Sequence, residues 1–220
     1  VTKREVTSAA EAGDLYGYGS PIHTMMRVLR PLSGDGVGGI PTVVFPQLPN
    51  VGATATVRAW TVTGTASANA THTVIVNGRD NVDYKEYSFS VVSGDTDTVV
   101  AGKIKDAINA VTSAPCTATS TGAVMTATSK WKGATSAELD ITISYGSNAA
   151  GLAYSQTTST NGAGAVSLAA SLEQFGDDWY TMVVNPYGTS QLATLEQFNG
   201  VPNNTTPTGR YSGLIYKPFC

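Results

Sequence analysis

The side chains that most often do chemistry in proteins are sparse in this chain and far apart in sequence. In 220 residues there are two histidines, His23 and His72, and two cysteines, Cys116 and Cys220. A zinc site needs three or four such ligands, and a nucleophilic side chain needs a neighbouring base. His23 lies among apolar residues and His72 opens a strand-like stretch, so we interpret both as packing residues. The cysteines lack the spacing of a disulfide framework, which favours two free thiols and a reducing cytoplasm.

Acidic residues offer two weak alternatives. Four aspartates could supply oxygen ligands to calcium: Asp80, Asp83, Asp95 and Asp97. Helix capping explains Gly94–Thr98 more simply, because this stretch directly precedes a helical pattern. Asp177 and Asp178 form a pair only in sequence, and we interpret them as a solvated turn.

Glycine and tryptophan do not indicate a ligand site either. Gly34–Gly39 precedes a strand instead of following one, and it lacks the Lys-Ser or Lys-Thr of a phosphate-binding loop. Trp60, Trp131 and Trp179 have no basic residues interleaved with them, and the formal net charge is −3, so the footprint of a nucleic-acid-binding protein is missing. We therefore predict no catalytic, cofactor-binding or metal site.

The middle of the chain shows the clearest structural pattern. Strands are predicted over residues 51–62, 72–79, 84–92, 116–120, 123–129 and 139–145, because these runs are rich in β-branched residues or alternate apolar with polar residues. One helix lies between the third and fourth strands. Its apolar face repeats at helical spacing through Val100, Ile104, Ala107, Ile108 and Val111. We expect this helix to lie on the sheet.

The flanking stretches predict a second, mixed layer. Helices are expected over residues 7–12, 20–30, 166–175 and 190–199, with strands over 40–45 and 179–184. The helix over 20–30 has the strongest signals, with Ser20 as N-cap and Pro21 at the first helical position. Trp179–Val184 is continuously apolar, which is typical of a buried strand.

These elements predict an α+β protein. A discontinuous α/β layer domain, residues 1–50 and 162–220, is interrupted by a β-rich, mostly antiparallel insertion domain with one helix, residues 51–161. Charged residues make up 13% of the chain and apolar residues 41%, a composition that suits a packed structural protein. Val1 as first residue and the apolar stretch 214–220 indicate an internal fragment of a longer polypeptide whose α/β layer is incomplete.

The order of several stretches resembles the contractile tail sheath proteins of bacteriophages, in particular the Mu-like branch. The resemblance rests on Thr7–Ala12 followed by Leu15–Ser20, then Val74–Gly78 with Ser93–Thr98, and then the Trp179–Tyr187 stretch. Lys132 and Gly133 also occur in the expected order, and the resemblance covers nearly the whole chain.

Several expectations follow from the resemblance. It implies a virion component, assembled in the host cytoplasm, that polymerises in helical rings around a tail tube and contracts to drive the tube through the host envelope during genome ejection. The implied partners are further copies of the sheath subunit and the tail tube protein, with the baseplate and the tail terminator beyond them, and no direct nucleic acid. We expect neither enzymatic activity nor a cofactor, and we expect the fragment alone to be monomeric.

Two alternatives stay open. The Thr/Ser-rich strands also suit a surface-exposed, adhesin-like module that binds a receptor or a glycan. A small hydrolase is the other alternative, although the sequence shows no nucleophile elbow and no convergent acid and base.

Overall fold

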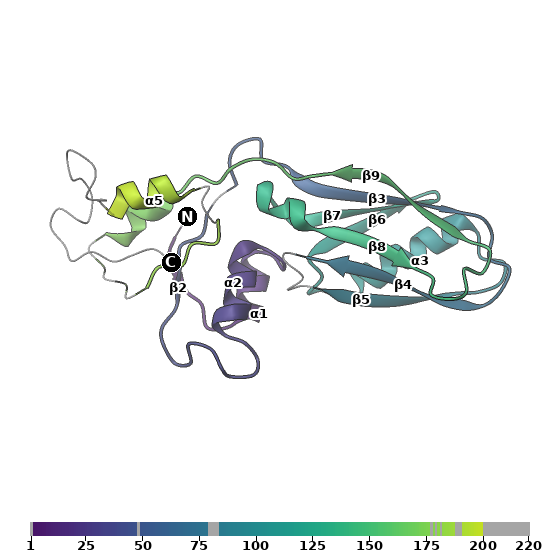
Figure 1. The fold of residues 1–220 in the computed structure, drawn as a ribbon, viewed down its shortest axis with the longest axis horizontal. Coiled ribbons are helices and arrows are strands. Elements are labelled where there is room, and N and C mark those ends of the chain that lie inside the picture. Colours follow the sequence, from purple (N-terminus) through teal and green to yellow (C-terminus); the bar gives the residue numbers. More distant parts are fainter. Residues whose placement is uncertain are drawn as a thin grey trace.

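The computed structural model describes residues 2–47, 49–78, 84–176, 178, 180, 182–187 and 191–199. The described chain is elongated, with a β-rich part at one end and a smaller, mainly helical part at the other (Figure 1). We call residues 55–160 the sandwich. The described residues of 2–47 and 168–199 are called the helical part. None of the helices in these described ranges is long and apolar enough to cross a membrane.

The sandwich contains two antiparallel sheets. A four-stranded sheet has the order β6-β7-β3-β9, and a three-stranded sheet has the order β5-β4-β8. The strands of the first sheet are β3 (Ala55–Thr63), β6 (Cys116–Thr121), β7 (Val124–Lys132) and β9 (Ala153–Thr160). Those of the second are β4 (Ala70–Asn77), β5 (Lys85–Val91) and β8 (Asp140–Ser144). The short 3-10 helix η2 (Ala134–Glu138) precedes β8.

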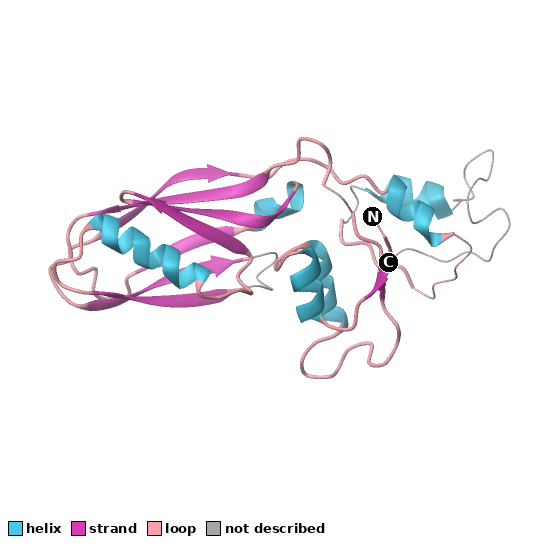
Figure 2. Cartoon of the chain, turned by 180° about the vertical axis from the view of Figure 1, so that it is seen from behind, coloured by secondary structure: helices cyan, strands magenta, loops and turns pink. Residues whose placement is uncertain are grey.

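Helix α3 (Asp97–Asn109) links the two sheets and packs against both, as the view from behind shows (Figure 2). Its buried residues are Val100, Ala101, Ile104 and Ile108, which confirms the predicted apolar face. Thr96 Oγ1 accepts a hydrogen bond from the Val99 N–H, so the predicted capping role of this stretch is also confirmed. In β5 the alternate residues Tyr87, Phe89 and Val91 face the same core. The helix therefore completes a core shared by two sheets, where the sequence predicted a single sheet.

The edge strand β9 was not predicted. Seven of its eight residues are exposed, and it pairs only with β3. Only Tyr154 of this strand is partly buried, so apolar and polar residues do not alternate along it and the periodicity used to find strands is absent.

The helical part has five further elements besides a short strand pair. Strands β1 (Arg4–Glu5) and β2 (Val43–Val44) pair antiparallel. The helices are α1 (Ala9–Tyr16), α2 (Pro21–Leu29), α4 (Ala169–Leu172), the 3-10 helix η3 (Glu173–Phe175) and α5 (Leu192–Asn199). Ser20 caps α2 and Pro21 is at its start, as predicted. The predicted strand over 40–45 is thus reduced to the two residues of β2.

One prediction for the helical part is wrong, and another falls partly outside the described residues. The first helix starts after Ser8 and continues through Gly13, because Gly13 is buried against the Tyr18 ring, where a Cβ would lie 2.5 Å from ring carbon. The predicted buried strand over 179–184 lies partly outside the described residues, because Trp179 and Thr181 are not described. Of its described residues, Met182 is 53% exposed, and Tyr180, Val183 and Val184 line an open groove.

The core of the sandwich should dominate its stability. Replacing Ile104, which is fully buried on α3, with Ala should lower the free energy of unfolding by about 2–5 kcal/mol, because it leaves a cavity among both sheets. The matched change Val99→Ala on the same helix, at a residue 45% exposed, should alter it by about 0.5 kcal/mol or less. Urea denaturation of both variants measures the difference, and equal losses would contradict this packing.

The ionised carboxylate of Asp95 should stabilise the fold, and acid should remove this contribution. Its pKa is lowered, first by the hydrogen bond from Lys103 and then by the Val92 N–H. A carboxyl with a lowered folded-state pKa stabilises the fold above its unfolded pKa of about 3.9, and this contribution is lost as the pH falls through the folded value. Asp95→Asn should therefore lower Tm at pH 7, and the gap to the unmodified protein should close below about pH 4.

The exposed Asp106 provides the control for this experiment, since its side chain is 72% exposed. Asp106→Asn should leave Tm nearly unchanged at every pH between 7 and 2.5. If the difference in Tm between Asp95→Asn and the unmodified protein stays constant across this range, the charge of the carboxylate is not what stabilises the fold.

Candidate functional site: an apolar groove in the helical part

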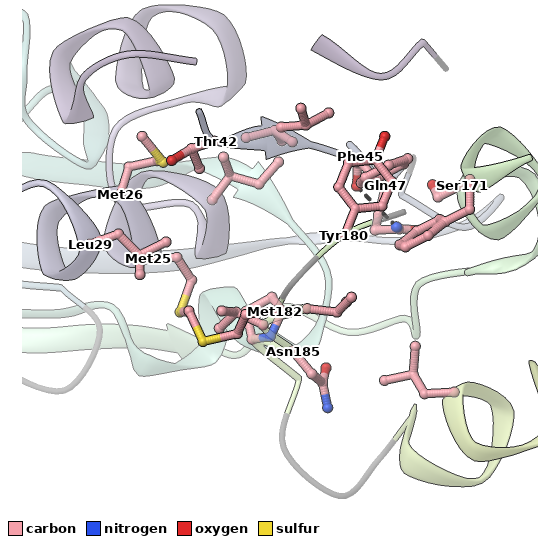
Figure 3. Close-up of a pocket in the computed structure, with 18 of the residues that line it drawn as sticks. Met25, Met26, Leu29, Thr42, Phe45, Gln47, Ser171, Tyr180, Met182 and Asn185 are labelled. Atoms are coloured by element: carbon pink, nitrogen blue, oxygen red, sulfur yellow. Dashed lines mark hydrogen bonds between the residues drawn. The ribbon is translucent and has the colours of Figure 1, made fainter. Parts of the chain in front are cut away.

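The helical part contains an apolar groove of about 700 Å³ (Figure 3). Its walls come from α2, the 37–47 segment with β2, the α4–η3 turn, the 180–187 segment and α5. Residues from these walls include Met25, Leu29, Phe45, Leu172, Met182 and Leu195. The groove therefore gathers residues from both ends of the described chain.

Helix α2 supplies one wall because its apolar residues repeat every three or four positions. Met26 is almost fully buried in a cluster with Val6 and Ala12 and also borders the groove, which the half-buried Met25 and Leu29 line as well. Met25 and Met182 both point into the groove from opposite sides (Figure 3). Methionine side chains are unbranched and adaptable, so such a wall can fit apolar surfaces of several shapes.

Aromatic rings close the other end of the groove. Phe45 stacks on Phe175 with ring centroids 4.1 Å apart, and Tyr180 meets each of them edge-on at 5.3 Å. Ser171 Oγ donates a hydrogen bond to the Pro46 carbonyl at 2.8 Å, which ties α4 to the segment after β2. This end of the groove is well packed, so the open part lies between α2 and the 182–187 segment.

A polar atom in the groove wall has no partner within the described chain. Gln47 donates from Nε2 to the Phe45 carbonyl at 3.1 Å, but its buried Oε1 accepts no hydrogen bond from the described residues. A buried acceptor without a donor costs about 1–3 kcal/mol. An occupant of the groove that brings an N–H or O–H to Gln47 would remove this cost.

Neither histidine that the sequence analysis considered as a possible base or metal ligand lies in the groove wall. His23 is 6% exposed, its Nδ1 accepts from the Gly19 N–H at 3.0 Å, and its ring packs edge-on against Tyr18. His72 is fully buried in the sandwich, where Nε2 is 2.9 Å from the Asn148 carbonyl. Because a carbonyl only accepts, Nε2 carries the proton. Both histidines are therefore buried and hydrogen-bonded within the described chain.

His72 also links the two sheets. Its Nδ1 accepts a hydrogen bond from the Tyr154 hydroxyl, which belongs to β9 in the opposite sheet. Burial raises the pKa of Tyr154, so the phenol keeps its proton and can donate at neutral pH. The pair is a buried inter-sheet contact whose polar atoms are satisfied within the protein, not an acid-base pair facing a cavity.

The remaining chemical candidates are also structural. Burial raises the pKa of the Cys116 thiol to about 12, which makes it a poor nucleophile, and this thiol is free. Asp95 is bound to Lys103 and Asp97 lies in the first turn of α3. Over the described residues, no group of three His, Cys, Asp or Glu side chains could hold a metal ion. Asp80, Asp83, Asp177 and Cys220 lie outside the described residues.

The glycine-rich loop and the tryptophans are accounted for in a similar way. The Arg30 guanidinium donates to the carbonyls of Gly38 and Ile40, which folds the 34–39 loop onto the end of α2. Trp131 is 7% exposed, and Trp60 is half-buried against the sandwich core. Asp178, one of the paired aspartates, is exposed and forms an ion pair with Lys3.

Comparison with known proteins identifies one kind of relative. The chain is 30% identical over 193 residues to the Mu-like prophage FluMu tail sheath protein of Haemophilus influenzae, a match that covers 86% of this chain. The chain is related to phage tail sheath proteins. The match spans 38% of that tail sheath protein's own length, and no family profile matches the chain. The resemblance predicted from the order of short stretches is thereby confirmed.

The sequence analysis missed the groove as a site. Each wall residue was assigned to a helix face or a strand of its own segment. A single segment cannot show that apolar faces from residues 22–47 and 168–195 stay uncovered when the chain folds. The sequence does contain one useful signal: the helices predicted for the helical part have more apolar faces than two short strands can cover.

The groove should bind a fluorescent apolar dye such as 8-anilinonaphthalene-1-sulfonate, since exposed apolar surface is what this dye reports. Met182→Glu places a charge in the groove and should reduce the dye fluorescence several-fold. Val99→Glu changes a residue of similar exposure on α3 and should leave the fluorescence unchanged. Equal fluorescence from both variants would show that the dye binds elsewhere.

Proposed function

We propose that this chain is part of a structural subunit of a contractile phage tail sheath. In this proposal the subunits polymerise in helical rings around the tail tube and contract to drive the tube through the host envelope. The observation that carries it is the similarity to a tail sheath protein over 86% of the chain. The function then lies in contacts between protein surfaces, and no catalytic step is required.

The geometry of the described residues supports an interface function. Polar side chains with catalytic potential are engaged in packing, as His23, His72 and Cys116 show. An apolar surface that remains open among the described residues is the groove of the helical part. A sheath that contracts moves rigid subunits between two sets of contacts, the second of lower free energy, so it needs stiff bodies and well-defined surfaces.

We further propose that residues 1–50 and 162–220 belong to a sheath core domain and residues 51–161 to an inserted domain. The described helical part has an apolar cluster of three buried residues, Val6, Ala12 and Met26, whereas the cluster in the sandwich has 21 buried residues. A two-stranded sheet is marginal by itself. The match covers 38% of the tail sheath relative. We propose that polypeptide of the full-length sheath protein that corresponds to the unmatched part of this relative fills the groove and completes the core.

The remaining assignments follow from the same role. The proposed partners are other sheath subunits, the tail tube protein, and the baseplate and tail terminator at the two ends of the tail. The proposed location is the virion, with assembly in the host cytoplasm. The sandwich, which is closed and carries small polar side chains on its exposed strand β9, would face away from the lattice contacts.

Polymer formation by the full-length sheath protein that contains this sequence tests the proposal. Expressed alone, it should form tubes with a regular helical repeat in negative-stain electron microscopy. Ile40 lines the groove and is 64% exposed, so Ile40→Asp should leave the subunit folded but abolish the tubes, because further sheath polypeptide in the groove would bury the charge.

The control for this experiment is Val92→Asp in the sandwich, a residue that is 48% exposed and should tolerate the charge. This variant should polymerise as the unmodified protein does. A full-length protein that stays monomeric under all conditions would contradict the proposal and favour the receptor- or glycan-binding alternative.

A further inference from the structure

The turn between α1 and α2, residues 17–20, touches the sandwich directly. Helices α1 and α2 lie next to one end of the sandwich in both views (Figure 1, Figure 2). Gly19 in this turn is buried, and a Cβ on it would lie 2.6 Å from the Pro115 Cβ and 2.6 Å from the Trp131 ring. Pro115 and Trp131 belong to the sandwich. The backbone of the α1–α2 turn is therefore packed against the sandwich with no room for a side chain between them.

The two chain connections between the sandwich and the helical part are solvated. Residues 50–52 of the first connection and residues 163–165 of the second are exposed. An isolated bridge between Pro49 and Val166 pairs the connections with each other. Exposed backbone with few buried contacts opens easily, and two parts joined in this way move relative to each other unless an interface holds them. A fixed orientation therefore needs a contact outside the connections.

The α1–α2 turn is itself held in one shape by hydrogen bonds. The Gly19 N–H donates to His23 Nδ1 at 3.0 Å, and the His23 N–H donates to Ser20 Oγ at 3.3 Å. The Ser20 N–H donates to the Gly17 carbonyl at 3.1 Å. Because these bonds join the turn to the first residues of α2, Gly19 cannot shift without disturbing the start of that helix.

The surface of the sandwich that receives the turn is also held in place. The Lys130 N–H donates to the Pro115 carbonyl at 3.0 Å, which ties the segment before β6 to β7. Trp131, the next residue on β7, is 7% exposed. Lys130 Nζ donates to the Thr112 carbonyl at 2.6 Å and lies 5.6 Å from the centre of the Tyr18 ring, within the range of a cation–π contact. An apolar contact and a cation–π contact thus join the same two surfaces.

We infer that the α1–α2 turn is the contact that fixes the orientation of the sandwich on the helical part, with Gly19 seated against Pro115 and Trp131. The inference goes beyond the proposed sheath function and does not depend on it. Position 19 requires glycine because a Cβ has no room there and because a φ of +83° disfavours other residues. Without this close fit, both parts should stay folded and rotate about the solvated connections.

Double electron–electron resonance between spin labels at Val28→Cys on α2 and Thr119→Cys on β6 tests the inference, in a Cys220→Ser background. Both labelled residues are exposed, and Cys116 is buried. The chain with Gly19 should give one narrow distance distribution. Gly19→Ala should shift its maximum or at least double its width. Gly34→Ala is the matched control and should change neither, since Gly34 has a similar φ of +86° but open space where the Cβ would lie.

A second pair of variants decides the question if circular dichroism melts show that Gly19→Ala does not fold. Lys130→Ala removes the cation beside Tyr18 from an exposed position and should give a smaller broadening. Lys132→Ala, at another exposed lysine of β7, should leave the distribution unchanged. A distribution that is already broad in the unmodified chain would overturn the inference. It would also be overturned if every folded variant of Gly19 and Lys130 kept the position and width of the unmodified chain.

Discussion

The packing of α3 between two sheets is the interaction on which the β-rich part of this protein depends. Ile104 and Ile108 reach a core to which both sheets contribute, so neither sheet has to bury its apolar face by itself. The helical part has no equivalent element. Helix α2 covers Val6 and Ala12 on one side, but on its other side Met25 and Leu29 face an open groove. Apolar burial is therefore complete in one part of the molecule and unfinished in the other.

This asymmetry connects the structure with the proposed role. A closed sandwich can vary its surface without losing stability, whereas an open apolar groove calls for an occupant. Within the sandwich, the buried hydroxyls of Thr56 and Ser136 and the guanidinium of Arg58 form a network in which polar groups satisfy one another. Buried polar networks of this kind favour one geometry over nearby alternatives, because any displacement leaves acceptors without donors. A subunit that transmits force needs such a fixed geometry.

The elements that could be predicted from the sequence are those whose signals are local. Ser20 and Pro21 mark the start of α2, and the spacing of Val100, Ile104 and Ile108 marks the buried face of α3. The failures have tertiary causes. Gly13 was interpreted as a helix end although it is a close-packing position beneath Tyr18, and the edge strand β9 has no buried face to give it a period.

The candidate site was harder to predict than the fold for the same physical reason. The absence of catalytic chemistry was argued from side-chain types, but the groove exists only because Phe45, Phe175 and Tyr180 meet across more than 120 intervening residues. Arg58 likewise looks like an ordinary charged residue in an alternating strand. Its hydrogen bonds go to Ala137 and Asn161, which no spacing rule connects with it.

The central claim is that this chain acts as a rigid sheath subunit through its surfaces. Cryo-electron microscopy of the assembled full-length protein, before and after contraction, tests it most directly. The account predicts that the sandwich and the helical part superpose as one body in both states, with the groove filled by further sheath polypeptide. A groove left empty in both states, or a sandwich that rotates against α1 and α2 on contraction, would contradict it.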